Sequence, residues 1–129
     1  MIAHLSEKPR LDTTEWDRMS STNAALDGAT FSTLDAFASR MTRQGVTTVL
    51  MPPSILDLQY RREQKNIDRV FSRISRQATG RNFQVLGTPA EFTFPARLMF
   101  DTQYHLNRDG RALRTQSMLD LLTEAALNR

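Results

Sequence analysis

Apolar residues recur at helical spacing in three segments of the chain. The first segment begins at Thr30 and is followed by Gly45, a residue type that commonly ends helices. The second segment lies within roughly 57 to 78. The third follows Asn107 and Asp109, and either of these residues can cap its first turn. We expect the buried faces to contain Phe31, Leu34, Phe37, Ala38 and Met41 in the first helix, Ile67, Val70, Phe71 and Ile74 in the second, and Leu113, Met118, Leu121, Leu122 and Ala125 in the third.

Two short runs between these helices have the pattern of buried strands. Residues 46–51 are rich in β-branched side chains and are bounded by Gly45 and a pair of prolines, and residues 83–87 follow the second helix. The alternation of helices and strands predicts parallel pairing with a right-handed crossover. The sequence therefore predicts an α/β fold, a partial three-layer α/β/α arrangement with two or three parallel strands and about three helices. Residues 88–97 are expected to form an ordered but irregular loop.

The length of 129 residues fits one domain. We expect residues 1–29 to form a polar tail, with at most a short helix near Trp16, and residues 30–129 to form the α/β domain. His4 lies in the tail and is interpreted as a solvated side chain, because no partner for a ligand site is nearby in the sequence.

Composition excludes several kinds of site. The 17 basic residues are scattered among 14 acidic ones, without a basic stripe, so we expect no nucleic-acid partner. The absence of cysteine and the wide separation of the two histidines give no metal-ligand spacing, and nothing indicates a cofactor. No window is apolar for the roughly 18 residues that a membrane span requires, and the first residues do not have the pattern of a signal peptide. These features leave the compartment open.

The chemistry that the sequence offers is concentrated in one stretch. Asp101 and His105 lie four residues apart, after an apolar run and just before the third helix. A carboxylate beside an imidazole fixes its tautomer and stabilises its cation, which is what a general base requires. Ser54 follows the first strand and could approach a ligand, but we interpret it as the cap of the second helix.

The order of elements, together with the run Asp-Thr-Gln-Tyr-His-Leu-Asn-Arg-Asp-Gly-Arg at residues 101–111 and the following Arg114-Thr115, resembles the C-terminal half of the SGNH (GDSL-like) hydrolase superfamily. Within it, the run is similar to the last motif of bacterial SGNH-like O-acyltransferases and cell-envelope polysaccharide proteins. The resemblance covers roughly residues 30 to 127. It implies a flavodoxin-like fold of the SGNH type and a Ser-His-Asp triad, with His105 as general base, Asp101 as orienting carboxylate and an ester or acylated carbohydrate as substrate.

Two departures from the family pattern limit what the chain is expected to do alone. The family places its aspartate three residues before the histidine, whereas here the interval is four. The Gly-Asp-Ser motif that carries the nucleophile is absent, and Asn23, the one candidate by order for the oxyanion asparagine, lacks the preceding strand and glycine. No strand-to-helix elbow surrounds Ser20, Ser21, Ser32, Ser39 or Ser54.

These observations leave two hypotheses. In the first, the chain is the C-terminal part of an SGNH-like serine esterase or O-acyltransferase, inactive alone because it supplies only the His and Asp of the triad. In the second, it is a non-catalytic α/β binding or assembly module in which His105 and Asp101 brace the last loop. In either case we expect an unpaired sheet edge at residues 46–51, through which copies of the chain could self-associate.

Overall fold

The computed structural model describes residues 28–128 as a small α/β fold with three helices and short parallel strands. Its elements in chain order are α1 (Gly28–Arg43), β1 (Thr48–Leu50), β2 (Ile55–Leu56), α2 (Asp57–Ala78), β3 (Phe83–Val85), the 3-10 turn η3 (Pro89–Phe92), β4 (Thr93–Phe94), the 3-10 turn η4 (Ala96–Leu98) and α3 (Arg108–Leu127). The predicted α/β class, parallel pairing and three helices are confirmed. Residues 1–27 of the expected tail, with His4, Trp16 and Asn23, lie outside the described residues, whereas Gly28 and Ala29, which the prediction also placed in the tail, begin α1.

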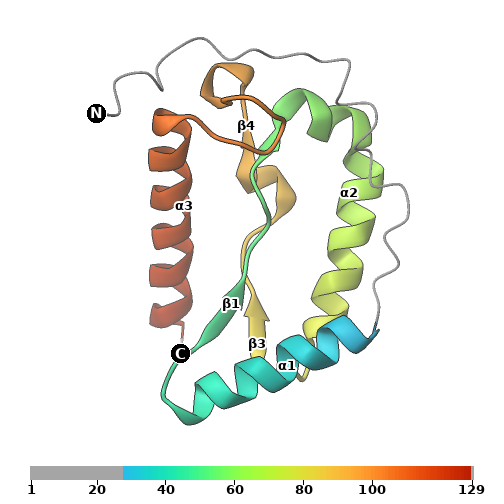
Figure 1. The fold of residues 1–129 in the computed structure, drawn as a ribbon, viewed down its shortest axis with the longest axis vertical. Coiled ribbons are helices and arrows are strands. Elements are labelled where there is room, and N and C mark those ends of the chain that lie inside the picture. Colours follow the sequence, from blue (N-terminus) through green and yellow to red (C-terminus); the bar gives the residue numbers. More distant parts are fainter. Residues whose placement is uncertain (1–27, 129) are drawn as a thin grey trace.

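The strands form two small parallel sheets where the sequence predicted one. β1 pairs with β3, with Thr48 opposite Phe83, and β2 pairs with β4, with Ile55 opposite Thr93. The interruption falls at Pro52 and Pro53, which have no N–H to donate to a ladder. Figure 1 shows α2 and α3 on opposite sides of the strands, with α1 lying across one end.

The helix ends follow from local chemistry. Gly45 and Gly80 have φ of 76° and 77° just after α1 and α2, in a region that glycine enters without strain. At the start of α3, the side chain of Asn107 accepts a hydrogen bond from the N–H of Gly110 at 3.0 Å. Of the two predicted caps, Asn107 is therefore the one used.

Buried side chains form two clusters rather than one core. The first lies beneath the segment that leads to α3 and contains Leu56, Phe92, Phe94, Leu98, Met99 and Leu106. The second joins α1 to the end of α2 and to β3, and contains Phe31, Ala38, Ala78 and Phe83. The segment predicted as an irregular loop, residues 88–97, therefore contributes Phe92 and Phe94 to the first cluster. Within it, β4 lies between the two 3-10 turns.

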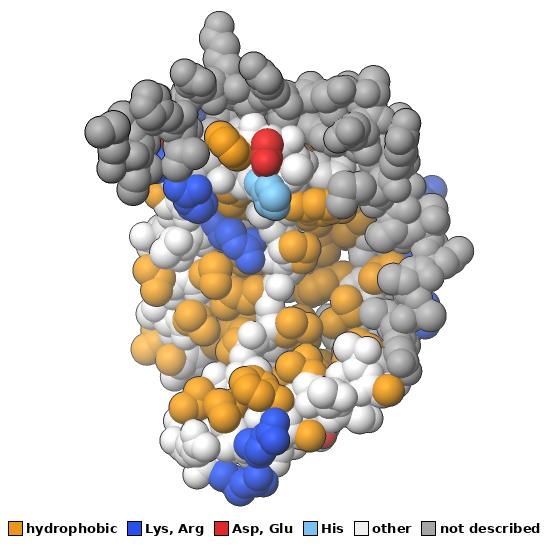
Figure 2. Space-filling model, viewed as in Figure 1, with side chains coloured by type: hydrophobic (Ala, Val, Ile, Leu, Met, Phe, Trp, Pro, Cys, Tyr) orange, Lys and Arg blue, Asp and Glu red, His pale blue; other side chains and the backbone are white. Residues whose placement is uncertain are grey.

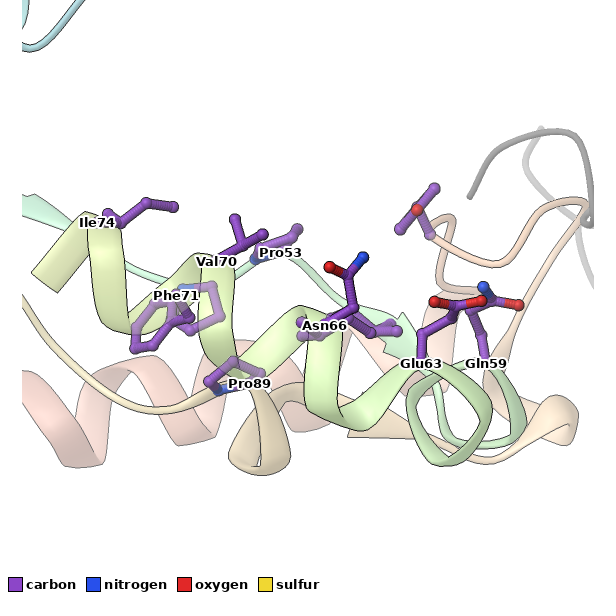
Figure 3. A pocket seen from close by; sticks show the side chains of 12 residues that line it. Pro53, Gln59, Glu63, Asn66, Val70, Phe71, Ile74 and Pro89 are labelled. Atoms are coloured by element: carbon purple, nitrogen blue, oxygen red, sulfur yellow. The ribbon is translucent and has the colours of Figure 1, made fainter. Parts of the chain in front are cut away.

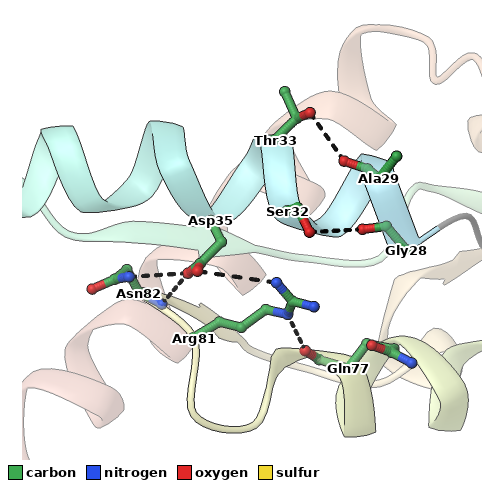
Figure 4. Close-up of polar contacts among 8 residues, drawn as sticks. All are labelled: Gly28, Ala29, Ser32, Thr33, Asp35, Gln77, Arg81 and Asn82. Carbon is green, nitrogen blue, oxygen red and sulfur yellow. Dashed lines mark hydrogen bonds and ion pairs between the residues drawn. The ribbon is translucent and has the colours of Figure 1, made fainter.

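A polar contact ties α1 to the turn after α2. Oδ1 of Asp35 accepts hydrogen bonds from the backbone N–H of Asn82 at 2.7 Å and from its side-chain amide at 3.0 Å, and Oδ2 lies 4.0 Å from Arg81 (Figure 4). Helix and turn are 47 residues apart in the chain, so this contact fixes the position of α1 against β3.

Part of the predicted burial is wrong. Phe37 on α1 and Leu113 and Leu122 on α3 are exposed, although their spacing placed them on buried faces. The reason is that a two-stranded sheet covers only a narrow strip of each helix; on α3 the hydrophobic side chains packed against the first cluster are Met118 and Leu121. Among the described residues, no helix is both long and apolar enough to cross a membrane.

Candidate functional site

Asp101 and His105 lie on a tight loop between η4 and α3. Met99 and Leu106 form an isolated antiparallel bridge across its base, and the N–H of Phe100 donates to the carbonyl of His105 at 2.7 Å. Within the loop, the hydroxyl of Thr102 accepts hydrogen bonds from the N–H of Tyr104 at 3.2 Å and of His105 at 3.1 Å. These bonds fold the four-residue interval back on itself, so that its two ends meet.

The structure brings the two predicted site residues into contact. Nδ1 of His105 lies 2.7 Å from Oδ1 of Asp101. An ionised carboxylate only accepts hydrogen bonds, so the proton of the neutral imidazole lies on Nδ1 and the lone pair on Nε2. The interval of four residues, one more than in the family pattern, therefore does not prevent the pairing.

The pair is open to solvent. The side chains of His105 and Asp101 are 65% and 50% exposed, and Nε2 makes no hydrogen bond with a described residue. The one histidine among the described residues, pale blue in Figure 2, lies at one end of a face on which hydrophobic side chains gather. The free Nε2 can take a proton from a group that approaches this face.

Two hydrogen bonds from the segment around β2 hold the loop at Gln103 and Tyr104. The hydroxyl of Ser54 donates to the carbonyl of Tyr104 at 2.6 Å, and the N–H of Leu56 donates to the carbonyl of Gln103 at 2.9 Å. The prediction that Ser54 caps α2 is wrong: Leu56 occupies the cap position and makes no side-chain cap bond. Ser54 instead holds the loop of the Asp-His pair, fifty residues away in the chain.

The start of α3 fixes the other end of the loop. The side-chain amide of Asn107 donates to the carbonyl of Arg97 at 2.7 Å, while its oxygen caps the helix. Gly110 lies so close to η4 that an added Cβ would come within 2.6 Å of the carbonyl oxygen of Leu98. The start of α3 thus packs closely against η4, the segment that precedes Asp101.

Arg114 connects α3 to the segment after β1, a role that the sequence reasoning missed. Its Nη2 donates to the carbonyl of Pro52 at 3.1 Å, and its guanidinium lies 4.7 Å from the ring centroid of Phe92. Burial lowers the pKa of Arg114 from its ordinary value. The signal was available, because Arg114 lies on the same helical stripe as Gly110, Met118 and Leu121, at intervals of three and four residues.

Two buried polar groups near the site have no partner among the described residues. One is the side-chain amide of the fully buried Gln103, whose Nε2 and Oε1 both lack a partner. The other is Nη1 of Arg114. Unpaired polar groups in the interior are costly, so they are uncommon in the cores of folded proteins. Gln103 is a member of the loop whose inward orientation no sequence pattern indicated.

The serines considered from the sequence that lie among the described residues each take part in a hydrogen bond. The hydroxyl of Ser54 is engaged with Tyr104, that of Ser32 donates to the carbonyl of Gly28, and that of Ser39 accepts from Arg43 on the exposed side of α1. Ser20 and Ser21 lie outside the described residues. No group of three or more His, Cys, Asp or Glu side chains with metal-binding geometry occurs among residues 28–128.

A pocket of about 220 Å³ lies between α2 and the segment after β1. Figure 3 shows its lining: Gln59, Glu63 and Asn66 gather at one end, and Val70, Phe71 and Ile74 at the other. Tyr104, the neighbour of His105, also lines it. The pocket therefore has a polar and an apolar end, and one of its lining residues is adjacent in sequence to His105.

Comparison of the chain with protein-family models, with curated proteins and with solved structures gave no match.

Proposed function

We propose that this chain is the C-terminal part of an SGNH-like serine esterase or O-acyltransferase, in which His105 is the general base and Asp101 its orienting carboxylate. The observation that carries the proposal is the 2.7 Å contact between Nδ1 of His105 and Oδ1 of Asp101, with Nε2 left open to solvent. In this account the nucleophilic serine comes from polypeptide outside residues 28–128. An ester or an acylated carbohydrate is the proposed substrate class.

The chemistry assigned to the pair is a balanced acyl transfer. Nε2 of His105 removes the proton of the serine hydroxyl as the serine oxygen bonds to the ester carbonyl carbon. The ester bond breaks, and the alcohol leaves with the proton that His105 returns. Water or a sugar hydroxyl then attacks the acyl-serine and loses its proton to Nε2; the bond between the acyl carbon and the serine oxygen breaks, and the serine oxygen takes that proton back from His105. Asp101 stabilises the imidazolium formed in each half of the reaction.

The bonding of the loop supports a chemical role over a bracing role. Ser54, Thr102 and Leu56 hold the loop through backbone carbonyl and amide groups, without help from the imidazole ring. The exposed His-Asp contact adds little to that scaffold, because ion pairs in solvent contribute only about 0 to 1 kcal/mol. A histidine kept in one tautomer at the surface is better suited to moving protons than to fixing the fold.

The test is the hydrolysis of p-nitrophenyl acetate by the longest natural polypeptide that contains this sequence. We expect His105→Ala to lower kcat by about 100- to 10,000-fold, the usual contribution of a general base. Asp101→Asn should also lower kcat strongly, because it disturbs the tautomer. Asp109→Asn is the matched control, since this exposed carboxylate lies in the first turn of α3 and should leave kcat unchanged. Equal rates in wild type and His105→Ala would refute the proposal.

The alternative function, a non-catalytic binding or assembly module, is favoured by one observation: the hydroxyls of Ser32, Ser39 and Ser54 are engaged with Gly28, Arg43 and Tyr104, and none of them contacts His105. If it is correct, His105→Ala should lower the free energy of unfolding substantially and should affect no ester hydrolysis. A fully stable His105→Ala variant would count against bracing by this side chain.

A further inference from the structure

The edge of β1 that faces away from β3 is unpaired within the described part of the chain. The carbonyl of Leu50 accepts a hydrogen bond from Leu86 at 3.0 Å on the β3 side. Because successive residues of an extended strand turn their N–H and C=O groups to alternate sides, Val49 presents both groups to the free edge. Such groups are a template for another strand.

Hydrophobic surface flanks this edge. β1 lies between α2 and α3 in Figure 1, and its three residues are only half-buried. The face in Figure 2 carries hydrophobic side chains across its centre. The pocket continues from β1, since Pro52 and Pro53 contribute to its lining together with the apolar stripe of α2. This stripe has the spacing of a core face but is only partly covered.

The charge of the pocket selects among occupants. Glu63 is the one carboxylate in the lining, and it makes no ion pair or hydrogen bond with a described residue. It lies at the same end as Gln59 and Asn66, opposite Phe71 (Figure 3). An occupant that matches this polarity has a basic group at one end and an apolar side chain at the other.

We propose that the free edge of β1 and the pocket beside α2 bind an extended segment of a partner polypeptide as an additional strand. The segment exchanges backbone hydrogen bonds with Val49, places an apolar side chain against Phe71 and places a Lys or Arg beside Glu63. A small molecule would fill the pocket but leave the edge of β1 unpaired. The inference does not depend on the role of Asp101 and His105.

The experiment is to pan a display library of random peptides on the immobilised chain and to measure the affinity of the selected peptides. We expect alternating apolar and β-branched sequences with one Lys or Arg. Val49→Pro removes the edge N–H but leaves the ladder to β3 intact, so it should weaken binding about tenfold or more. Val49→Thr keeps the N–H and is the matched control. N-methylation of a single peptide amide should cause the same loss, which tests the backbone bonds without altering the protein.

Side-chain variants test the pocket separately. Glu63→Gln should weaken the binding of peptides that carry a basic residue. It should leave the affinity of the same peptides with Lys replaced by Gln unchanged. Phe71→Asp should abolish binding, whereas Leu127→Asp, at a side chain 82% exposed on the last turn of α3, should have no effect. Failure to select any peptide above background, or binding insensitive to Val49→Pro and to N-methylation, would overturn the proposal. So would light scattering that shows a dimer which Val49→Pro dissociates, because a second copy would then occupy the edge.

Discussion

Ser54 shows how a single side chain supports the site from a distance. Its hydroxyl and the carbonyl of Tyr104 lie 2.6 Å apart, and Ser54 is buried. Ser54→Ala leaves that carbonyl without a partner, so we expect the free energy of unfolding to fall by about 1 to 3 kcal/mol. Urea denaturation measures the change.

The matched control is Ser32→Ala, since the hydroxyl of Ser32 also donates to a carbonyl but lies on the exposed side of α1. This change should stay within about 0.5 kcal/mol of wild type. Equal losses for Ser54→Ala and Ser32→Ala would show that the Ser54 contact does not hold the loop.

At the residue scale, sequence reasoning selected Asp101 and His105 and missed the residues beneath them. Their spacing and position were visible because they are local. Ser54 and Tyr104 are brought together by the tertiary fold, across fifty positions, so no pattern of neighbours could indicate the bond. The same holds for the inward side chain of Gln103.

Asp35 links two elements, and the link should depend on pH. The backbone N–H of Asn82, and then its side chain, hold the pKa of Asp35 below the ordinary value of 3.8. A carboxyl group with a lowered pKa in the folded state contributes stability above its unfolded pKa. That contribution is lost as the pH falls through the folded value.

We therefore expect wild type to lose stability below about pH 3.8 more steeply than Asp35→Asn, when Tm is followed over this range. Parallel curves for the two proteins would contradict a role of the Asp35 carboxylate in joining α1 to the turn before β3.

The close contact of α3 with η4 is possible because Gly110 has no side chain. An added Cβ would lie 2.6 Å from the carbonyl oxygen of Leu98 and 2.9 Å from Cδ2 of Leu106. Gly110→Ala must displace α3, and we expect a loss of about 1 to 3 kcal/mol in unfolding free energy.

Gly28→Ala is the control for this change, because a Cβ at Gly28 would meet nothing within 4 Å. A Gly110→Ala variant with the Tm of wild type would show that α3 does not need this close approach.

At the element scale, the periodic segments were predictable and the short strands were not. The second helix was placed at residues 57 to 78 from its apolar spacing, and α2 occupies Asp57–Ala78. β2 and β4 have two residues each, too few to show an alternation, and they exist because each supplies the other with a ladder partner. Residues 88–97 were predicted only as an irregular loop, whereas Phe92 and Phe94 within it are members of a buried cluster.

The whole molecule consists of three helices around two sheets of two strands each within the described residues. The buried side chains form two separate clusters, and hydrophobic side chains also gather on the face shown in Figure 2. The sequence predicted three buried helix faces, but it could not indicate how much sheet there would be to cover them. Leu113 and Leu122 are exposed for this reason. A partner strand at β1 would extend the sheet beneath these helices.

We propose that Asp101 fixes the tautomer of His105 and leaves Nε2 free to act as a base. The most direct test is the ¹⁵N spectrum of the imidazole, recorded at a pH where the ring is neutral. We expect the proton to reside on Nδ1 in wild type and the Nε2–H form to become populated in Asp101→Asn. A wild-type ring protonated on Nε2, or the same tautomer ratio in both proteins, would contradict it.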